Sequence, residues 1–149
     1  MRAFLGLGSN IGDRRHLLRE AVGAMPDVVA VSPVYETDPV GGPAQDDYFN
    51  IVVEIDTLLS PRELLARCQE LERAADRRRI IRWGPRTLDV DVIWIEGHEI
   101  DDDDYEVPHP RAHQRNFVMV PLLAIDPTFV MPGYDPDQAI GVVRPIGPL

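Results

Sequence analysis

Two aspartates separated by one residue are the groups in this chain whose chemistry is easiest to state. Asp89 and Asp91 lie in the segment from Leu88 to Ile95, where polar and apolar residues alternate before an apolar run. This pattern predicts a strand with one buried face. Alternate side chains of a strand point the same way, so the two carboxylates would share a face, about 7 Å apart at the backbone. Such a pair repels unless a cation lies between its members, and Mg²⁺ binds one or two carboxylates together with substrate phosphates.

A cluster of positive charge precedes this strand. Five of the chain's fifteen basic residues fall within ten positions, and they are Arg77, Arg78, Arg79, Arg82 and Arg86. The chain contains no lysine, so the choice of arginine over lysine says nothing about function. The clustering is informative, because the chain as a whole has a net charge of −10. Guanidinium groups bind phosphate oxygens at two points. Arginines beside metal-binding acids are what a nucleoside triphosphate site needs.

Each of these features also has a simpler interpretation. An isolated Asp-x-Asp on a strand usually belongs to a solvated face, and an arginine run at the end of a helix usually complements the helix dipole. Here Trp83, Gly84 and Pro85 stand between the arginines and the strand, and Gly-Pro predicts a fixed turn. The combination favours a phosphate and metal site.

Length and composition limit the class of protein. At 149 residues, 44% hydrophobic and 27% charged, the chain is expected to form one domain, residues 1–149. Its negative charge argues against a general nucleic-acid binder, which needs a basic face. The single cysteine, Cys68, lies in a helical apolar pattern and is predicted to be a core residue. We found no membrane-spanning stretch or signal-peptide pattern, so a cytoplasmic location is expected.

The order of elements predicts an α+β fold. Ser60, Pro61 and Glu63 form a capping box that starts one helix. The expected elements are a strand at 4–8, a helix at 14–25, a strand at 28–35 interrupted by Pro33, a strand at 48–55, a helix from 61, a strand at 88–95 and a helix at 118–125. This order is the split βαβ, ferredoxin-like pattern, with an antiparallel sheet, helices packed on it and an added C-terminal helical segment. The proline-rich tail from Asp126 is expected to pack irregularly.

Three further segments contain residue types that could do chemistry. The glycine-rich turn after the first strand, residues 8–13, lacks the Gly-Lys-Ser/Thr of a phosphate loop and is expected to be structural. The acidic run at 101–104 is expected to be a solvated loop. His109 and His113 have helical spacing, but a zinc site would need two more ligands that Cys68 and His98 do not convincingly supply.

The segment from Arg82 to Asp91 resembles the signature of the 6-hydroxymethyl-7,8-dihydropterin pyrophosphokinase family. The resemblance extends over nearly the whole chain. It implies transfer of pyrophosphate from ATP to the hydroxymethyl group of the pterin, with AMP as the second product, a step of tetrahydrofolate biosynthesis. It implies that Asp89 and Asp91 hold two Mg²⁺ ions. Arg82 and Arg86 would stabilise charge on the transferred group, with Asp91 part of the same catalytic set.

The resemblance also implies residues that bind each substrate. The pterin set is Thr37, Pro39, Val40, Gly41, Tyr48, Asn50, Asp89 and Phe117. In that set Tyr48 and Phe117 would stack on opposite faces of the pterin, and Asn50 would bond its edge. The ATP set is Gln69, Glu72, Arg77, Arg79, Arg82, Trp83, Arg86, Ile93, His109 and Arg115. Asp38 and Asp76 stand where proline and glycine are common in the family.

Two alternative functions remain open from the residues. Ferredoxin-like domains also bind RNA through aromatic residues on the sheet, although the negative charge counts against that function here. A phosphotransferase with another heterocyclic acceptor is the second alternative, because Tyr48, Asn50 and Phe117 do not by themselves distinguish pterin from purine. The expected partners are ATP and the pterin, with no nucleic acid or membrane, and the expected state is a monomer.

Overall fold

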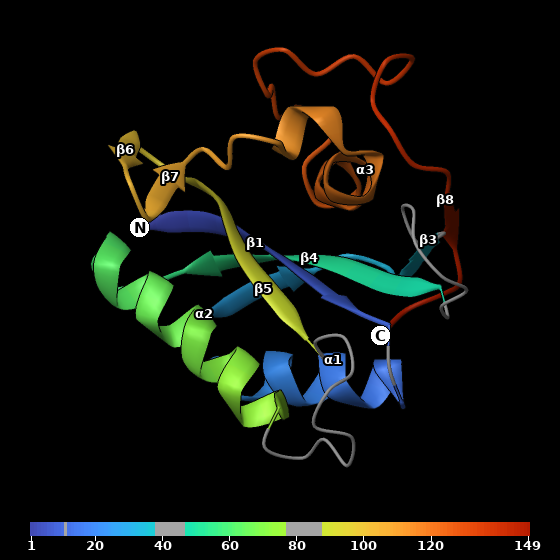
Figure 1. Cartoon of the computed structure of the whole chain (residues 1–149), viewed down its shortest axis with the longest axis horizontal. Coiled ribbons are helices and arrows are strands. Elements are labelled where there is room, and N and C mark those ends of the chain that lie inside the picture. Colours follow the sequence, from blue (N-terminus) through green and yellow to red (C-terminus); the bar gives the residue numbers. More distant parts are fainter. Residues whose placement is uncertain (11, 38–46, 77–87) are drawn as a thin grey trace.

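One antiparallel sheet organises the part of the chain that the structure describes. The structure is a computed structural model and describes residues 1–10, 12–37, 47–76 and 88–149. Figure 1 shows the arrangement of its elements, which are β1 Arg2–Ser9, α1 Arg14–Gly23, β2 Val28–Val31, β3 Tyr35–Thr37, β4 Tyr48–Asp56, α2 Pro61–Asp76, β5 Asp89–Ile95, β6 Ile100–Asp102, β7 Tyr105–Val107, the 3₁₀ turn η1 Ala112–Gln114, α3 Asn116–Ile125 and β8 Val143–Pro145.

The strand order confirms the predicted fold class. The main path of the sheet is β5-β1-β4-β3-β8, and β2 also pairs with β4. All pairings in the sheet are antiparallel, with β1 aligned on β4 from Arg2 opposite Asp56 to Ser9 opposite Phe49. The last strand of the split βαβ unit, β5, therefore lies beside the first, β1. This is the ferredoxin-like arrangement.

The two faces of the sheet are covered by different helices. Figure 1 shows α1 and α2 on one face and α3 on the other. On β1, Leu5 and Leu7 belong to the core with α1 and α2, whereas Phe4 belongs to the core with α3. The α3 core contains Val52, Ile93, Met119 and Leu122. α3 covers only part of its face, and the uncovered end of that face is where polar side chains gather.

A bulge in β5 separates its polar end from its apolar end. The register with β1 shifts so that Leu5 pairs with Val92 and Phe4 pairs with Trp94, which leaves Ile93 as the extra residue. Ile93 and Trp94 therefore both contact the α3 core, although neighbouring strand residues normally face opposite ways. Before the bulge the ordinary alternation holds. It buries Val90 against α1 and α2 and leaves Asp89 and Asp91 on the α3 face.

Most predicted element ends agree with the structure, and the capping box is present. The backbone N–H of Ser60 donates to Glu63 at 2.9 Å, and the N–H of Glu63 donates to the Ser60 hydroxyl at 3.2 Å. The predicted strand at 28–35 is interrupted around Pro33, as expected, and its two parts are β2 and β3. Between them the Ser32 hydroxyl accepts from the N–H of Val52 at 2.9 Å, so a side chain replaces a ladder acceptor next to Pro33.

The C-terminal tail is more regular than expected. It adds an edge strand, β8, whose Val143 pairs with Thr37 of β3. Arg15 on α1 donates to the carbonyls of Ile146 and Pro148, both at 2.7 Å, so the end of the tail is fastened to α1. The tail was predicted to be irregular because its prolines suppress the strand pattern. The edge strand β8 forms because β3, which is distant in the sequence, pairs with it.

One smaller prediction is confirmed, and another holds in part. Cys68 is 1% exposed, and burial raises the pKa of its thiol to about 12, so it is a core residue and not a nucleophile. The acidic run at 101–104 is exposed, as expected, but it is not a loop throughout, because its first two residues belong to β6. Asp102 and Asp104 pair with Arg62. In the described ranges, none of the helices is both long and apolar enough to span a membrane.

We predict that the largely buried ion pair between Arg67 of α2 and Asp27 stabilises the fold. Arg67 donates to both oxygens of Asp27, at 2.9 and 3.0 Å. Burial raises the pKa of Asp27, but hydrogen bonds from Arg67 and Thr57 outweigh it and hold the pKa below the ordinary 3.8. Arg67→Ala should lower the free energy of unfolding by about 2 kcal/mol at pH 7, because a charged carboxylate loses its donors. Urea denaturation measures this directly.

The stability that this ion pair contributes should depend on pH. A carboxylate with a lowered pKa contributes stability above its unfolded pKa and loses it as pH falls through the folded pKa. The difference between wild type and Arg67→Ala should therefore shrink as pH falls below 3.8. The control is Arg73→Ala on the same helix, whose exposed pair with Glu70 should be worth less than about 0.5 kcal/mol. Equal effects of the two substitutions would contradict the prediction.

Candidate functional site

A cavity opens on the α3 face of the sheet, at the end that α3 leaves uncovered. It has a volume of about 580 Å³, within the usual range for a small-molecule site. Its floor comes from β1, β4 and β5, and its walls come from β3, the segment around η1, the start of α3 and the C-terminal tail. Residues from almost the whole length of the chain therefore meet here.

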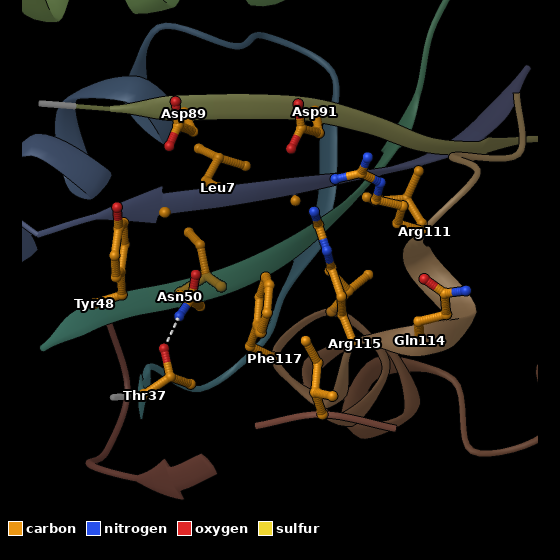
Figure 2. A pocket seen from close by; sticks show the side chains of 16 residues that line it. Leu7, Thr37, Tyr48, Asn50, Asp89, Asp91, Arg111, Gln114, Arg115 and Phe117 are labelled. Carbon is orange, nitrogen blue, oxygen red and sulfur yellow. Dashed lines mark hydrogen bonds between the residues drawn. The ribbon is translucent and has the colours of Figure 1, made fainter. Parts of the chain in front are cut away.

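The two aspartates of β5 lie side by side in this cavity. Figure 2 shows Asp89 and Asp91 projecting from β5 into it, on the same face of the strand. Asp91 is exposed and Asp89 is partly buried. Between them, the backbone N–H of Val90 donates to Glu72 of α2 at 3.0 Å. β5 is the edge strand of the sheet, so Glu72 satisfies an outward N–H that no neighbouring strand can reach.

Polar and aromatic groups on β4 and β3 form a second part of the cavity. The Asn50 side chain is 7% exposed and donates through Nδ2 to the Thr37 hydroxyl at 2.7 Å (Figure 2). This bond leaves the Asn50 Oδ1 as the acceptor that faces the cavity floor. Tyr48 shares the face of Asn50, and burial, followed by the charge of Asp89, raises the pKa of its hydroxyl above the usual 10. Tyr48 therefore stays protonated at neutral pH.

Gly8 on β1 makes room for the Asn50 amide. A Cβ at position 8 would lie 2.8 Å from the Asn50 Oδ1, closer than real Cβ contacts allow. Any other residue would push the amide away from the cavity floor. The glycine is thus required by close approach and not by an unusual backbone conformation.

The opposite wall carries cations and a second aromatic ring. Arg111, Gln114 and Arg115 come from the segment around η1, and Phe117 comes from the first turn of α3. The guanidinium carbon of Arg115 lies 5.5 Å from the centre of the Phe117 ring. Figure 2 shows both arginine side chains reaching toward the Asp91 side of the cavity, with Phe117 facing the Asn50 side. The cavity therefore has a charged end and an aromatic, hydrogen-bonding end.

His109 connects this wall to β5 without lining the cavity. Its backbone N–H donates to the carbonyl of Ile93 at 2.8 Å, and its Nδ1 accepts from the N–H of Arg111 at 3.2 Å. Burial lowers the pKa of His109 more than Asp91 raises it, and Arg115 and Arg111 lower it further. The ring is therefore neutral at pH 7 and carries its proton on Nε2.

The structure brings most of the described candidate residues together. Eight of them line the cavity, and they are Thr37, Tyr48, Asn50, Asp89, Asp91, Ile93, Arg115 and Phe117. Gln69, Glu72 and His109 do not line it, and Gln69 is exposed on α2. Eight other candidates lie outside the described residues, and they are Pro39, Val40, Gly41, Arg77, Arg79, Arg82, Trp83 and Arg86.

Some cavity residues were not singled out from the sequence. Arg111 stands in the Pro-His-Pro-Arg stretch, so its charge beside His109 was an available signal. Gly6 and Gly8 were also available, because they alternate with buried leucines on β1. The turn that begins at Gly8 was assigned a structural role, whereas Gly8 itself forms part of the floor. Gln114 and Ile140 carry no signal in the sequence.

The donor set fits magnesium when phosphate is also present. Within the ranges that the structure describes, there is no group of three or more acidic, histidine or cysteine side chains that could hold a metal ion alone. Asp89 and Asp91 supply two carboxylates on one face, and Mg²⁺ commonly takes only one or two, completing its shell with phosphates and water. The residues present therefore suit a metal that arrives with a phosphorylated ligand.

Comparisons with known proteins agree on one family. The profile described as 7,8-dihydro-6-hydroxymethylpterin-pyrophosphokinase matches residues 4–127. Curated proteins named 2-amino-4-hydroxy-6-hydroxymethyldihydropteridine pyrophosphokinase are similar to the chain. The protein from Bacillus subtilis is 46% identical over 83% of this chain and 77% of its own length. The protein from Methylorubrum extorquens is 44% identical over 98% of this chain and 96% of its own length.

A third relative of that name, from Mycobacterium tuberculosis, is 44% identical over 85% of this chain and 73% of its own length. The matches cover β1 to α3, the elements that build nearly all of the cavity. The paired aspartates, the Tyr48 and Asn50 face of β4 and the arginine wall all fall inside the matched region. The chain therefore belongs to the 7,8-dihydro-6-hydroxymethylpterin pyrophosphokinase family.

Proposed function

We propose that this protein transfers the terminal pyrophosphoryl group of ATP to the hydroxymethyl oxygen of 6-hydroxymethyl-7,8-dihydropterin. The oxygen attacks the β-phosphorus, the bond from that phosphorus to the α-β bridging oxygen breaks, and AMP leaves with the bridging oxygen. The hydroxyl proton is released to solvent. The observation that carries this proposal is one cavity with paired carboxylates, arginines and a heterocycle-sized aromatic end.

Asp89 and Asp91 would hold the magnesium that accompanies ATP, which we propose to be two ions. When bound, the metal would neutralise charge on the phosphates and lower the pKa of the attacking hydroxyl. The two carboxylates fix the position of the phosphates relative to the acceptor. Asp89 lies nearer Tyr48 than Asp91 does (Figure 2), so it also meets the hydroxymethyl end of the pterin.

The arginine wall binds the polyphosphate. Arg115 and Arg111 reach into the charged end of the cavity, where guanidinium groups bind phosphate oxygens. Arg82 and Arg86, which lie outside the described residues, would stabilise charge on the transferred group, together with Arg77 or Arg79. His109, neutral and with a proton on Nε2, can donate to a phosphate oxygen without adding charge.

The aromatic end binds the pterin. Tyr48 and Phe117 contribute rings from opposite walls, so a flat heterocycle can lie between them. The Asn50 Oδ1, held by the Thr37 bond, accepts from the amino and ring N–H groups of the pterin edge. Pro39, Val40 and Gly41, which lie outside the described residues, belong to the same proposed pterin set.

Several finer properties belong to the same proposal. The chain works as a single domain and as a monomer, in the cytoplasm, on ATP and the pterin alone. An RNA-binding function is not favoured, because the sheet face that would stack bases carries Asp89 and Asp91, whose charges repel a phosphate backbone. A different heterocyclic acceptor is not favoured either, since the family relationship selects the pterin.

Asp91→Asn should abolish most of the activity while leaving the fold intact. Asp91 is exposed, so its substitution leaves no buried charge unpaired. Losing a metal-binding carboxylate should lower kcat by about 10³-fold, because charge neutralisation at the transferred group is worth several kcal/mol. The measurement is AMP formation from ATP, Mg²⁺ and 6-hydroxymethyl-7,8-dihydropterin.

The control for that substitution is Asp103→Asn, which removes the same charge from the exposed β6–β7 hairpin and should leave kcat unchanged. AMP release by the wild type must depend on the pterin. If the product were ADP, the reaction would be ordinary phosphoryl transfer and the proposal would be wrong.

Thr37→Val should weaken pterin binding selectively. The substitution removes the hydroxyl that accepts from the Asn50 Nδ2, so the amide can rotate and present the wrong atoms to the heterocycle. We expect KM for the pterin to rise roughly tenfold, with KM for ATP unchanged. Thr37→Ser retains the hydroxyl and should restore most of the affinity. Identical kinetics for the Val and Ser variants would show that the hydroxyl does not orient Asn50.

A further inference from the structure

The C-terminal tail contributes one residue to the cavity. Of the sixteen lining residues in the described ranges, Ile140 alone comes from the chain beyond α3. It is 52% exposed, so half of its surface remains open to solvent beside the cavity. The family profile ends at residue 127, before this wall of the cavity, whereas the relative from Methylorubrum extorquens aligns over 98% of the chain.

Ile140 is held in place by backbone bonds to the η1–α3 junction. Its N–H donates to the carbonyl of Gln114 at 2.8 Å, and its carbonyl accepts from the N–H of Asn116 at 2.9 Å. These two bonds form a short parallel bridge beside Arg115. The tail therefore joins the wall that carries Arg115 and Phe117.

The side chain of Asn116 completes the attachment. Its Nδ2 donates to the carbonyls of Ala139 and Gly141, both at 3.2 Å, which are the carbonyls on either side of Ile140. Its Oδ1 accepts from the Tyr134 hydroxyl at 2.9 Å. A carboxamide has two N–H donors, and here both are used by the tail. Asn116 thus hydrogen-bonds the backbone on both sides of Ile140.

The path of the tail beyond Ile140 leads to the aromatic end of the cavity. Gly141 has φ +100, a left-handed conformation that favours glycine, and a Cβ there would lie 3.6 Å from the Phe117 ring. Two residues later, Val143 pairs with Thr37 on β3. Residues 140–143 therefore span from Phe117 to Thr37, and Figure 1 shows the tail descending from above α3 to β8 beside β3.

We propose that Ile140 is an acceptor-binding residue that closes the aromatic end of the cavity, and that Asn116 is the residue that positions it. The inference rests on the proposed function, because the ligand it contacts is the flat bicyclic acceptor. Ile140 adds apolar contact beside Phe117, and it stays in place because Asn116 fastens the chain on both sides of it. The bridge to Arg115 uses the backbone of Ile140, so truncating the side chain should leave that arginine, and with it ATP binding, in place.

Steady-state kinetics of the full chain tests this inference. Ile140→Ala should raise KM for 6-hydroxymethyl-7,8-dihydropterin roughly fivefold, because a partly exposed side chain loses only its inner contacts. KM for ATP should be unchanged and kcat should stay within about twofold of the wild type. The matched control is Val142→Ala, an apolar tail residue that is 67% exposed and does not line the cavity. It should leave both KM values unchanged.

A double-mutant cycle tests the positioning role of Asn116. Asn116→Asp keeps an acceptor for the Tyr134 hydroxyl and an acceptable residue at the start of α3, but it cannot donate to the two tail carbonyls. It should raise KM for the pterin to a similar extent. If Asn116 acts through Ile140, adding Ile140→Ala to Asn116→Asp should cause no further rise. Fully additive effects would overturn the positioning role.

Failure of this inference can be distinguished from failure of the proposed function. Calorimetry of the wild type with the pterin and a non-hydrolysable ATP analogue reports whether the acceptor binds at all. If it binds and turns over, but Ile140→Ala retains wild-type KM and Kd for the pterin, the inference alone is wrong. If the wild type neither binds the pterin nor releases AMP in its presence, the proposed function fails and the inference falls with it.

Discussion

Holding two carboxylates together at the edge of a sheet is the constraint on which the rest of the structure depends. Asp89 and Asp91 repel each other, so the backbone between them must be rigid enough to resist separation. Pairing with β1 on one side and the Glu72 bond to Val90 on the other provide that rigidity. Burial of Val90 against α1 and α2 anchors the same stretch from below. Strand β5 is thus held by β1, by Glu72 and by the core beneath Val90, and its remaining face carries the two aspartates.

The two faces of the sheet have different tasks. The α1 and α2 face is filled by aliphatic side chains and supplies most of the apolar burial. The α3 face is filled by side chains at one end only. At the other end the glycines of β1 have no side chains, and this leaves room for the cavity. The bulge at Ile93 marks the boundary, because it turns two consecutive residues toward the α3 core. Most of the apolar burial thus lies on the α1 and α2 face, whereas the cavity occupies one end of the α3 face.

The walls of the cavity depend on contacts between distant parts of the chain. The segment from His109 to Phe117 is placed by one bond to β5, and the tail is placed by pairing with that segment and with β3. A change in the tail can therefore alter the Phe117 side of the cavity without touching Asp89 and Asp91. This division separates the carboxylates of β5 from the wall that the tail joins to β3.

The sequence by itself determined the elements and the chemistry that they carry. Alternation in Leu88–Ile95 placed Asp89 and Asp91 on one face, the capping box located the start of α2, and Tyr48 and Asn50 followed from the same period of two. These predictions succeed because they depend on neighbours within a few residues. Tertiary structure alone decided the pairing of β8 with β3 and the place of Ile140. Each of these depends on a partner far away in the chain, and a local pattern carries no record of such a partner.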